Sequence, residues 1–332
     1  MNVFVLLHSD NGALPRIALE TLSAARQLDG NITVGILGTG AQAAADSIAD
    51  AAARFLVVDN PALAQPRYCT DAAAAAALIS AADAEIILAP ATARFNRALP
   101  GAAARTNAQI DTKIVGVVAE GGVVQAQRWY YRQRIFTTIS RTAKPWILLM
   151  EGGVYPAIEA APGGATTETV ACEFADTRTT VTGIQKPAAD AQTIRPEAKL
   201  LFVAGAGWTK KQKDGAPHVD VAGTLIQDFL RKSGASLGSS KSIVDLQSEG
   251  QGTLGFMTHM NQVGQTGSTP RHPKGLATCC HGEEPHAVGW RFINERRAIN
   301  LDANCGWAQG KADVLYVADA FEVMEKLNAL IG

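Results

Sequence analysis

The stretch Lys199-Leu-Leu-Phe-Val-Ala-Gly-Ala-Gly207 decides how the second half of the chain folds. An uninterrupted apolar run that ends at glycine is typical of a buried strand in a parallel sheet. Gly205 and Gly207 then predict a tight turn from strand to helix, where backbone amides can approach a phosphate. The turn is not a full Gly-x-Gly-x-x-Gly fingerprint, because Trp208–Lys210 follows, so alone it is a weak indication of nucleotide binding.

The remainder of the second half continues in the same α/β pattern. We expect a helix near Val219–Lys232 and a final helix at Ala320–Leu330. Short apolar runs predict strands between them. These strands are Ile243–Leu246, Leu276–Cys280, Arg297–Asn300 and Val314–Val317. Residues 199–332 therefore predict a doubly wound α/β domain.

The first 150 residues alternate β-branched runs with Ala/Leu-rich runs, which is typical of a parallel sheet covered by helices. The predicted strands are Val3–Leu7, Ile32–Leu37, Phe55–Val58 and Glu85–Ala89. The predicted helices are Pro15–Leu28, Ala41–Ala52, Asp71–Ala82 and Phe95–Ala104. From Lys113 the pattern changes to consecutive strands, at Lys113–Val118, Val123–Tyr131, Phe136–Ser140 and Trp146–Met150. These predict an antiparallel addition to the same domain.

The chain thus divides into three regions. Residues 1–150 predict a nucleotide-binding-like (Rossmann-like) domain. Residues 151–198 are rich in Gly, Pro, Ala and Thr, which indicates a linker, and an apolar stretch around Val170–Phe174 adds one more strand. Residues 199–332 form the second α/β domain.

Charge and hydropathy exclude several functional classes. Lys+Arg 30 against Asp+Glu 31 leaves a net charge of -1, which provides no electrostatic footprint for nucleic acid or an anionic membrane. No stretch of about 18 apolar residues predicts a membrane span. The start, Met1–Leu7, has no basic region and reads as a strand, so we expect a cytoplasmic protein. The aromatic and basic stretch Arg128–Arg134 reads as a strand that meets a partner protein or the second domain, although it could stack nucleobases.

The cysteines and histidines do not predict a metal site. None of the five cysteines forms a Cys-x-x-Cys pair, and Cys279-Cys280 reads as two reduced thiols ending a buried strand. His281 and His286 are five positions apart, and Pro285 prevents a regular helix between them. The segment instead predicts a polar loop at the carboxyl end of a strand, where such sheets bind ligands.

Further polar residues fall at the predicted carboxyl edge of the second sheet. Glycines in Gln262–Gly267 allow the backbone to approach a planar ligand, although a simple turn accounts for the same residues. Asn300 and Asp319 end two strands, and Asp319 is equally suited to cap the following helix. Ser240 and Lys241 fall in a loop before the predicted strand Ile243–Leu246.

Taken together, these motifs resemble the FAD domain of electron transfer flavoprotein alpha subunits. The matching segments are Gly238–Lys241, Val263–Gly267, the loop closing on His286, Ala298–Asn300 and Val317–Asp319. The first half is similar to that family at Leu7–Leu14 and Arg94–Arg105, so the resemblance covers essentially the whole chain. The chain is identified as a divergent member of the family.

The resemblance implies an FAD-containing electron carrier that is not an enzyme with its own organic substrate. It implies a heterodimer with an electron transfer flavoprotein beta subunit, a flavin-dependent dehydrogenase as donor, and a membrane quinone reductase or iron–sulfur protein as acceptor. By the same resemblance, Thr266 contacts the flavin, Val263–Gln265 line it, and His286 lies at its pyrimidine end. Asn300 and Asp319 hold the adenosine and Ser240 meets the diphosphate. The full implied FAD set is Ala206, Ser240, Lys241, Val263, Gly264, Gln265, Thr266, Gly267, His281, Gly282, Glu283, Glu284, Pro285, His286, Asn300, Asp319 and Ala320.

The sequence departs from the family pattern around the expected cofactor. Lys241 and Ala206 stand where the family usually has arginine, and the loop His281–His286 carries two added carboxylates. Fewer cations near an anionic cofactor predict a lower flavin potential or weaker binding. One alternative is an FAD-less scaffold or nucleotide-binding subunit of a flavoprotein dehydrogenase complex. An independent NAD-type dehydrogenase is disfavoured, because the sequence has no complete dinucleotide fingerprint.

Overall fold

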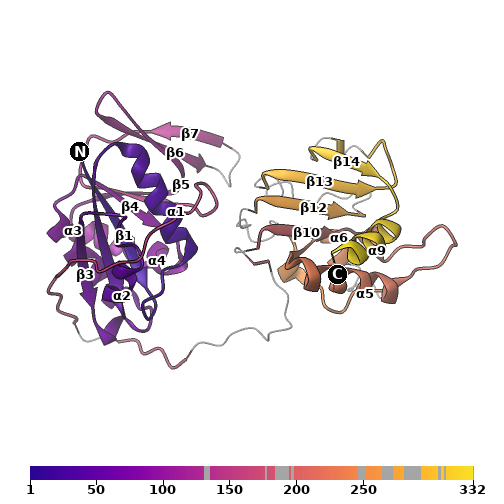
Figure 1. The fold of residues 1–332 in the computed structure, drawn as a ribbon, viewed down its shortest axis with the longest axis horizontal. Coiled ribbons are helices and arrows are strands. Elements are labelled where there is room, and N and C mark those ends of the chain that lie inside the picture. Colours follow the sequence, from indigo (N-terminus) through magenta and orange to yellow (C-terminus); the bar gives the residue numbers. More distant parts are fainter. Residues whose placement is uncertain are drawn as a thin grey trace. The chain divides into compact units, whose positions relative to one another are not determined.

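A computed structural model describes residues 1–130, 135–175, 178–183, 194–195, 198–245, 252–263, 272–279, 293–305, 308–309 and 312–331. The chain divides into two units, Met1–Gln185 and Lys186–Gly332. Figure 1 shows the elements of each unit. Within the described parts of the chain, no helix has both the length and the apolar composition needed to cross a bilayer.

The described strands of the first unit form one mixed sheet in the order β7-β6-β5-β8-β4-β1-β2-β3-β9. Neighbours are parallel except at the pairs β5/β6 and β6/β7. The bounds are β1 Asn2–Ser9, β2 Asn31–Gly38, β3 Arg54–Asp59, β4 Ile86–Pro90, β5 Gln109–Glu120, β6 Val123–Tyr130, β7 Ile135–Ile139, β8 Trp146–Met150 and β9 Thr167–Thr169.

Helices cover both faces of this sheet because the central strands are apolar on both sides. Val3, Val5 and Leu7 of β1 pack with α1 (Arg16–Ala25) and α2 (Ala41–Asp46). Phe4 and Leu6 pack with α3 (Tyr68–Ala82) and α4 (Ala93–Arg105). Short 3-10 helices η1 (Arg26–Leu28) and η2 (Pro61–Leu63) complete the unit. The predicted α/β class of the first half is confirmed.

Three local predictions for this unit were wrong in detail. The helix from Ala41 ends at Asp46, because the carbonyl of Asp46 accepts a hydrogen bond from Gly163 N at 2.9 Å instead of continuing the helix. Strand β8 belongs to the parallel part of the sheet, between β4 and β5, so only β6 and β7 form the antiparallel addition. The extra strand is β9, whereas the apolar residues of 170–174 pack on the α3/α4 core.

The described strands of the second unit form a fully parallel sheet in the order β11-β10-β12-β13-β14. The bounds are β10 Leu200–Ala204, β11 Ser236–Ser239, β12 Lys274–Thr278, β13 Glu295–Asn300 and β14 Val314–Val317. Helices α5 (Val219–Ser233) and α9 (Ala320–Leu330) pack together on one face, where Lys232 Nζ donates to the Asn328 carbonyl at 2.6 Å. The strand order reverses at β10, and ligands of open parallel sheets bind at such a reversal.

The predicted strand at Ile243–Leu246 was wrong. The strand ends at Ser239, and Lys241–Asp245 is the short helix α6. The reason is that Ser240 N donates to the Ala204 carbonyl at 2.8 Å, which turns the chain and buries Ile243 and Val244 as helical side chains. The predicted strand Val314–Val317 and helix Ala320–Leu330 are confirmed at both ends.

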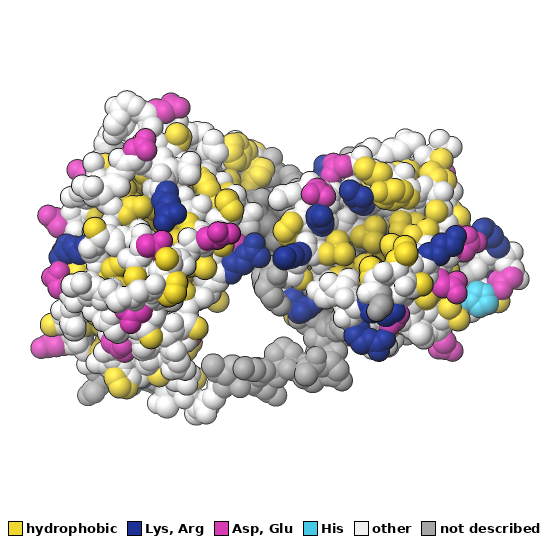
Figure 2. Space-filling view, viewed as in Figure 1, with side chains coloured by type: hydrophobic (Ala, Val, Ile, Leu, Met, Phe, Trp, Pro, Cys, Tyr) yellow, Lys and Arg dark blue, Asp and Glu magenta, His cyan; other side chains and the backbone are white. Residues whose placement is uncertain are grey.

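The surface carries charges of both signs. On the face shown in Figure 2, acidic and basic side chains are interspersed over the first unit, and apolar side chains gather in a patch on the second. The charged side chains of that face do not form a block of a single sign on the first unit, in keeping with the balanced composition.

Candidate functional site

The carboxyl ends of the parallel strands bring the described candidates to one edge of the second sheet (Figure 1). Ala206 follows β10, Ser240 and Lys241 follow β11, Asn300 ends β13, and Asp319 follows β14. Val263 joins them because its N–H donates to the Ser239 carbonyl at 3.1 Å, and Ala320 begins α9. The predicted residues of 264–267 and 281–286 lie outside the described residues.

The glycine turn after β10 is tied to its neighbouring strand. Gly205 N donates to the Thr278 carbonyl at 2.8 Å, and Gly207 N donates to the Cys279 carbonyl at 3.0 Å. These two amides are engaged within the fold, so the predicted phosphate cradle loses two of its donors. Ala206 lies in the short 3-10 helix η3 (Ala206–Trp208) and is fully buried.

Trp208 belongs to the core and does not cover the edge of the sheet. Its side chain is fully buried, its Nε1 donates to Thr278 Oγ1 at 2.8 Å, and its ring lies 4.7 Å from that of Phe321. The turn therefore anchors β10 against β12 and α9.

A small pocket lies at the ends of β12, β13 and β14. Its walls include Gly207, Gln212, Cys279, Asn300 and Asp319. The Asn300 side chain accepts a hydrogen bond from Asp302 N at 3.1 Å through Oδ1. Its Nδ2 is buried and has no hydrogen-bond partner among the described residues. Asn300 thus combines a place in the lining of the pocket with a buried donor that has no described partner.

One of the two roles predicted for Asp319, capping of the following helix, is confirmed. Its Oδ1 accepts the Phe321 N–H at 2.9 Å and caps α9, while Lys213 Nζ lies 3.6 Å from Oδ2. Capping uses Oδ1, and Oδ2 forms the ion pair with Lys213. The binding role of Asp319 stays a prediction.

Cys279 adds a thiol to this pocket. Burial, together with the nearby Asp319 charge, raises the pKa of the Cys279 thiol far above its ordinary value, so the thiol stays protonated. Its backbone has a φ of 55°, in the left-handed region where glycine is favoured. The described residues contain no group of three or more His, Cys, Asp and Glu side chains placed to hold a metal ion.

At the β11 end, the predicted cation Lys241 forms an exposed ion pair. Lys241 Nζ lies 3.7 Å from Asp245 Oδ2, one turn along α6, and the side chain is 63% exposed. Ser240 and Val263 are fully buried. Lys241 is therefore an exposed, paired lysine here.

Sequence reasoning missed two residues beside Ser240 and Val263. Ser239 and Gln262 form a parallel β-bridge, and both are buried. Ser239 Oγ and both polar atoms of the Gln262 carboxamide have no partner in the part of the chain that the structure describes. The only sequence signal was position, since Gln262 opens the glycine-containing segment and Ser239 precedes Ser240.

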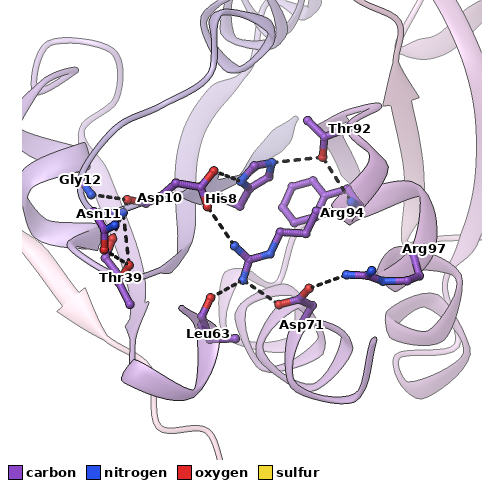
Figure 3. A network of polar contacts seen from close by, with 12 residues as sticks. His8, Asp10, Asn11, Gly12, Thr39, Leu63, Asp71, Thr92, Arg94 and Arg97 are labelled. Carbon is purple, nitrogen blue, oxygen red and sulfur yellow. Dashed lines mark hydrogen bonds and ion pairs between the residues drawn. The ribbon is translucent and has the colours of Figure 1, made fainter. Parts of the chain in front are cut away.

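The first unit carries a polar network at the ends of β1 and β4, shown in Figure 3. Arg94 is buried and donates to Asp71 Oδ1 at 2.7 Å, to the Leu63 carbonyl at 2.8 Å and to Asp10 Oδ1 at 3.3 Å. Arg97 reaches the other oxygen of Asp71 at 3.4 Å. Two carboxylates face two guanidinium groups, so the network balances its own charge and fastens β1, α3 and α4.

Burial also controls the titration of this network. It lowers the pKa of His8 to about 4, helped by the Arg94 charge, while His8 Nε2 lies 3.1 Å from Thr92 Oγ1. Burial raises the pKa of Asp71, although the hydrogen bond and charge of Arg94 oppose that rise. His8 is accordingly neutral at pH 7.

The start of α2, another place where a phosphate could bind, is closed by the protein itself. Gly40 N and Ala41 N donate to the two Asp59 carboxylate oxygens at 3.2 and 2.8 Å. A carboxylate already occupies the amides that an anion would use. The first unit therefore has a nucleotide-binding-like fold whose exposed helix start is satisfied internally.

Comparison with known proteins gives concordant matches. A family model described as electron transfer flavoprotein domain matches residues 3–176. The electron transfer flavoprotein subunit alpha of Pseudomonas aeruginosa is 26% identical over 100% of both chains. That of Bradyrhizobium diazoefficiens is 28% identical over 100% of this chain and 99% of its own. Protein FixB of Clostridium saccharobutylicum is 25% identical over 99% of this chain and 93% of its own.

Proposed function

This chain belongs to the electron transfer flavoprotein family, as a divergent alpha subunit, and from that premise we propose that its second unit holds FAD. In this proposal the chain serves electron transfer and has no organic substrate of its own. Bound flavin would take up and release the electrons, and the protein would bind and orient it.

The observation that carries the proposal is the buried amide of Asn300. A buried donor without a partner destabilises a fold by about 1–3 kcal/mol, so such groups are retained where a ligand uses them. Asn300 Nδ2 is such a donor, the residue Asn300 lines a pocket, and the pocket is at the carboxyl edge of a parallel sheet. We propose that Asn300 binds the adenosine part of FAD, beside Asp319 and Ala320.

The other predicted contacts remain part of this proposal. Ser240, Val263, the residues of 264–267 and the loop of 281–286 would complete the cofactor site, with Lys241 and Ala206 as the positions that lack the family's arginines. Lys241 lies 3.7 Å from Asp245, whose negative charge opposes that of the lysine. A low flavin midpoint potential is expected from this arrangement.

We also propose the family's partnerships for this chain. It would form a heterodimer with an electron transfer flavoprotein beta subunit in the cytoplasm. A flavin-dependent dehydrogenase would donate electrons, and a quinone reductase or an iron–sulfur protein would accept them.

The test is co-expression with the beta-like gene and an absorption spectrum of the purified heterodimer. A yellow complex with flavin bands supports the proposal. In it, Asn300→Leu should weaken FAD binding about tenfold or more, because the amide donor is lost. Asn31→Leu, at an exposed position of the first unit, is the matched control.

A colourless heterodimer that gains no colour with added FAD would contradict the proposal. That outcome would favour the second candidate, an FAD-less scaffold or nucleotide-binding subunit of a flavoprotein dehydrogenase complex. The engaged amides of Gly205 and Gly207 are the observation on the side of this alternative.

A further inference from the structure

We propose that residues 209–218 form a lid over the pocket at the ends of β12, β13 and β14, and that Lys213 latches this lid to α9. This role rests on the proposed function and deepens it, because it identifies the part of the second unit that moves when a nucleoside enters or leaves. The lid controls how fast the cofactor exchanges, and the contacts inside the pocket control how tightly it binds.

The pocket in its closed form is too small for a nucleoside. Its volume is about 10 Å³, which is room for about one water molecule. Its walls are built on the ends of β12, β13 and β14, on the turn after β10, on the start of α9, and on Gln212 of the lid. Paired strands and a capped helix hold the other walls in place, so entry of an adenosine requires the lid to move.

The lid folds on itself as a small hairpin. Lys211 and Pro217 form an antiparallel bridge. Gln212 N donates to the Ala216 carbonyl at 3.0 Å, and Gly215 N donates back to the Gln212 carbonyl at 2.9 Å. Because these hydrogen bonds join residues of the hairpin to one another, the hairpin can swing as one body without breaking them.

The hairpin stands clear of the core between two fixed points. Residues 213–217 are exposed, and a Cβ built on Gly215, whose φ is 83°, would meet no atom within 4 Å. On one side Trp208 is fully buried, and on the other α5 begins at Val219. A segment that buries so little surface opens at a small cost in free energy.

Two contacts hold the lid closed. Gln212 Nε2 donates to the Gly207 carbonyl at 3.0 Å, which joins the lid to the turn after β10. Lys213 Nζ lies 3.6 Å from Asp319 Oδ2 and 3.9 Å from Glu322 Oε1, at the start of α9. The lid thus connects the end of β10 to α9 at the carboxyl edge of the sheet (Figure 1).

The latch is built to open. The side chain of Lys213 is 70% exposed and that of Glu322 is 68% exposed, and an exposed ion pair favours the closed form by no more than about fivefold. Asp319, the second carboxylate of the latch, lines the pocket itself. Opening of the latch therefore also frees a carboxylate oxygen that faces the proposed adenosine site.

The experiment measures FAD association and dissociation in the full heterodimer by stopped-flow flavin fluorescence. Lys213→Gln removes the charge of the latch, so both rates should rise about two- to fivefold, because the latch breaks for entry and for exit alike. The FAD Kd should stay within twofold of its original value. The control is Lys211→Gln, which removes the same charge from an exposed position of the lid outside the latch and should leave both rates unchanged.

Ionic strength provides a second measurement. A change from about 0.01 M to about 1 M salt screens exposed ion pairs, so FAD dissociation should become faster in the unmodified protein and change less in Lys213→Gln. Glu322→Gln should also accelerate exchange. Combined with Lys213→Gln it should add less than its separate effect, since both side chains belong to one latch.

A faster dissociation with an equal rise in Kd and an unchanged association rate would show that Lys213 contacts the cofactor directly, and would overturn the lid. Unchanged rates in both Lys213→Gln and Glu322→Gln would overturn it as well. In either case the proposed function stands, because FAD is bound. A heterodimer that binds no FAD without any substitution would overturn both proposals together.

Discussion

Burial of His8 makes the stability of the first unit depend on pH. The pKa of His8 is lowered to about 4 in the folded state, first by burial and then by Arg94, against an ordinary value of 6.5. Between these values the unfolded chain binds a proton that the folded chain does not. The stabilisation is therefore complete above pH 6.5 and is lost as the pH falls toward 4, by about 3 kcal/mol in all.

This prediction is checked by urea unfolding of the first unit between pH 7 and 4. His8→Gln should flatten the loss of unfolding free energy over that window, since Gln does not titrate. His218→Gln, in the second unit, should leave the slope of the first-unit transition intact. Parallel slopes for His8→Gln and the unmodified protein would refute the role of His8.

Asp111 is the residue on which the antiparallel extension depends most. It is buried and accepts hydrogen bonds from Arg128 at 2.8 Å, from Trp146 Nε1 at 2.9 Å and from Arg141. Burial alone would raise the pKa of Asp111, but the Arg141 and Trp146 hydrogen bonds outweigh it and lower the pKa. This contribution is present above the unfolded value near 4 and is lost as the pH falls below it.

Asp111→Asn should destabilise the first unit by about 3–5 kcal/mol, because it leaves the Arg128 charge partly buried without its carboxylate. Chemical denaturation measures the change. Asp29→Asn, at an exposed left-handed position, is the control and should cost little. A loss below 1 kcal/mol for Asp111→Asn would show that the cluster is dispensable.

At the scale of single elements, the end of α3 can be improved. Asp83, the C-cap, is exposed and has a φ of 46°, which costs energy for any residue with a Cβ. Asp83→Gly should stabilise the first unit by about 0.5–1 kcal/mol, visible as a higher melting temperature. Asp83→Ala removes the same charge but keeps the Cβ, so it should give no such gain; equal gains would rule out the backbone as the cause.

The elements also show what the sequence could and could not predict. The buried strand β8 and the largely exposed edge strand β14 both follow from short apolar runs, and Asp319 follows from its place before an apolar helix. The pairing of β8 with β4 does not, because it depends on contacts between residues 86–90 and 146–150. Ile243 and Val244 suit a strand or a helix equally, and the hydrogen bond from Ser240 N to Ala204 O decides between them.

The sequence likewise predicted only some of the candidate site residues. Asn300 and Asp319 were found because they end strands at the carboxyl edge. Ser239 and Gln262 were not, because their significance lies in buried atoms without partners, and no residue pattern reveals that. The roles predicted for Thr266 and His286 stay predictions.

For the whole molecule, cofactor binding should act on one unit more than the other. The described candidate residues all lie in Lys186–Gly332. A ligand that binds only the folded form stabilises it by about 2.7 kcal/mol at a hundred times its Kd. FAD should therefore slow hydrogen exchange in β11 and β13 of the heterodimer.

In the same exchange experiment, the first unit serves as the internal control. Exchange in β1 and β2 of the first unit should not change on adding FAD, since no proposed FAD contact lies there. Uniform protection of both units would argue against a site confined to the second.

Trp208 is an intrinsic fluorophore close to the proposed cofactor site. The indole is fully buried against Thr278 and Phe321, directly behind the turn that borders the pocket. Tryptophan emits light in the range where oxidised flavin absorbs, so a flavin bound nearby drains that emission by energy transfer. Binding and release of FAD could then be followed in real time as a fall and a rise of tryptophan fluorescence, without any added label.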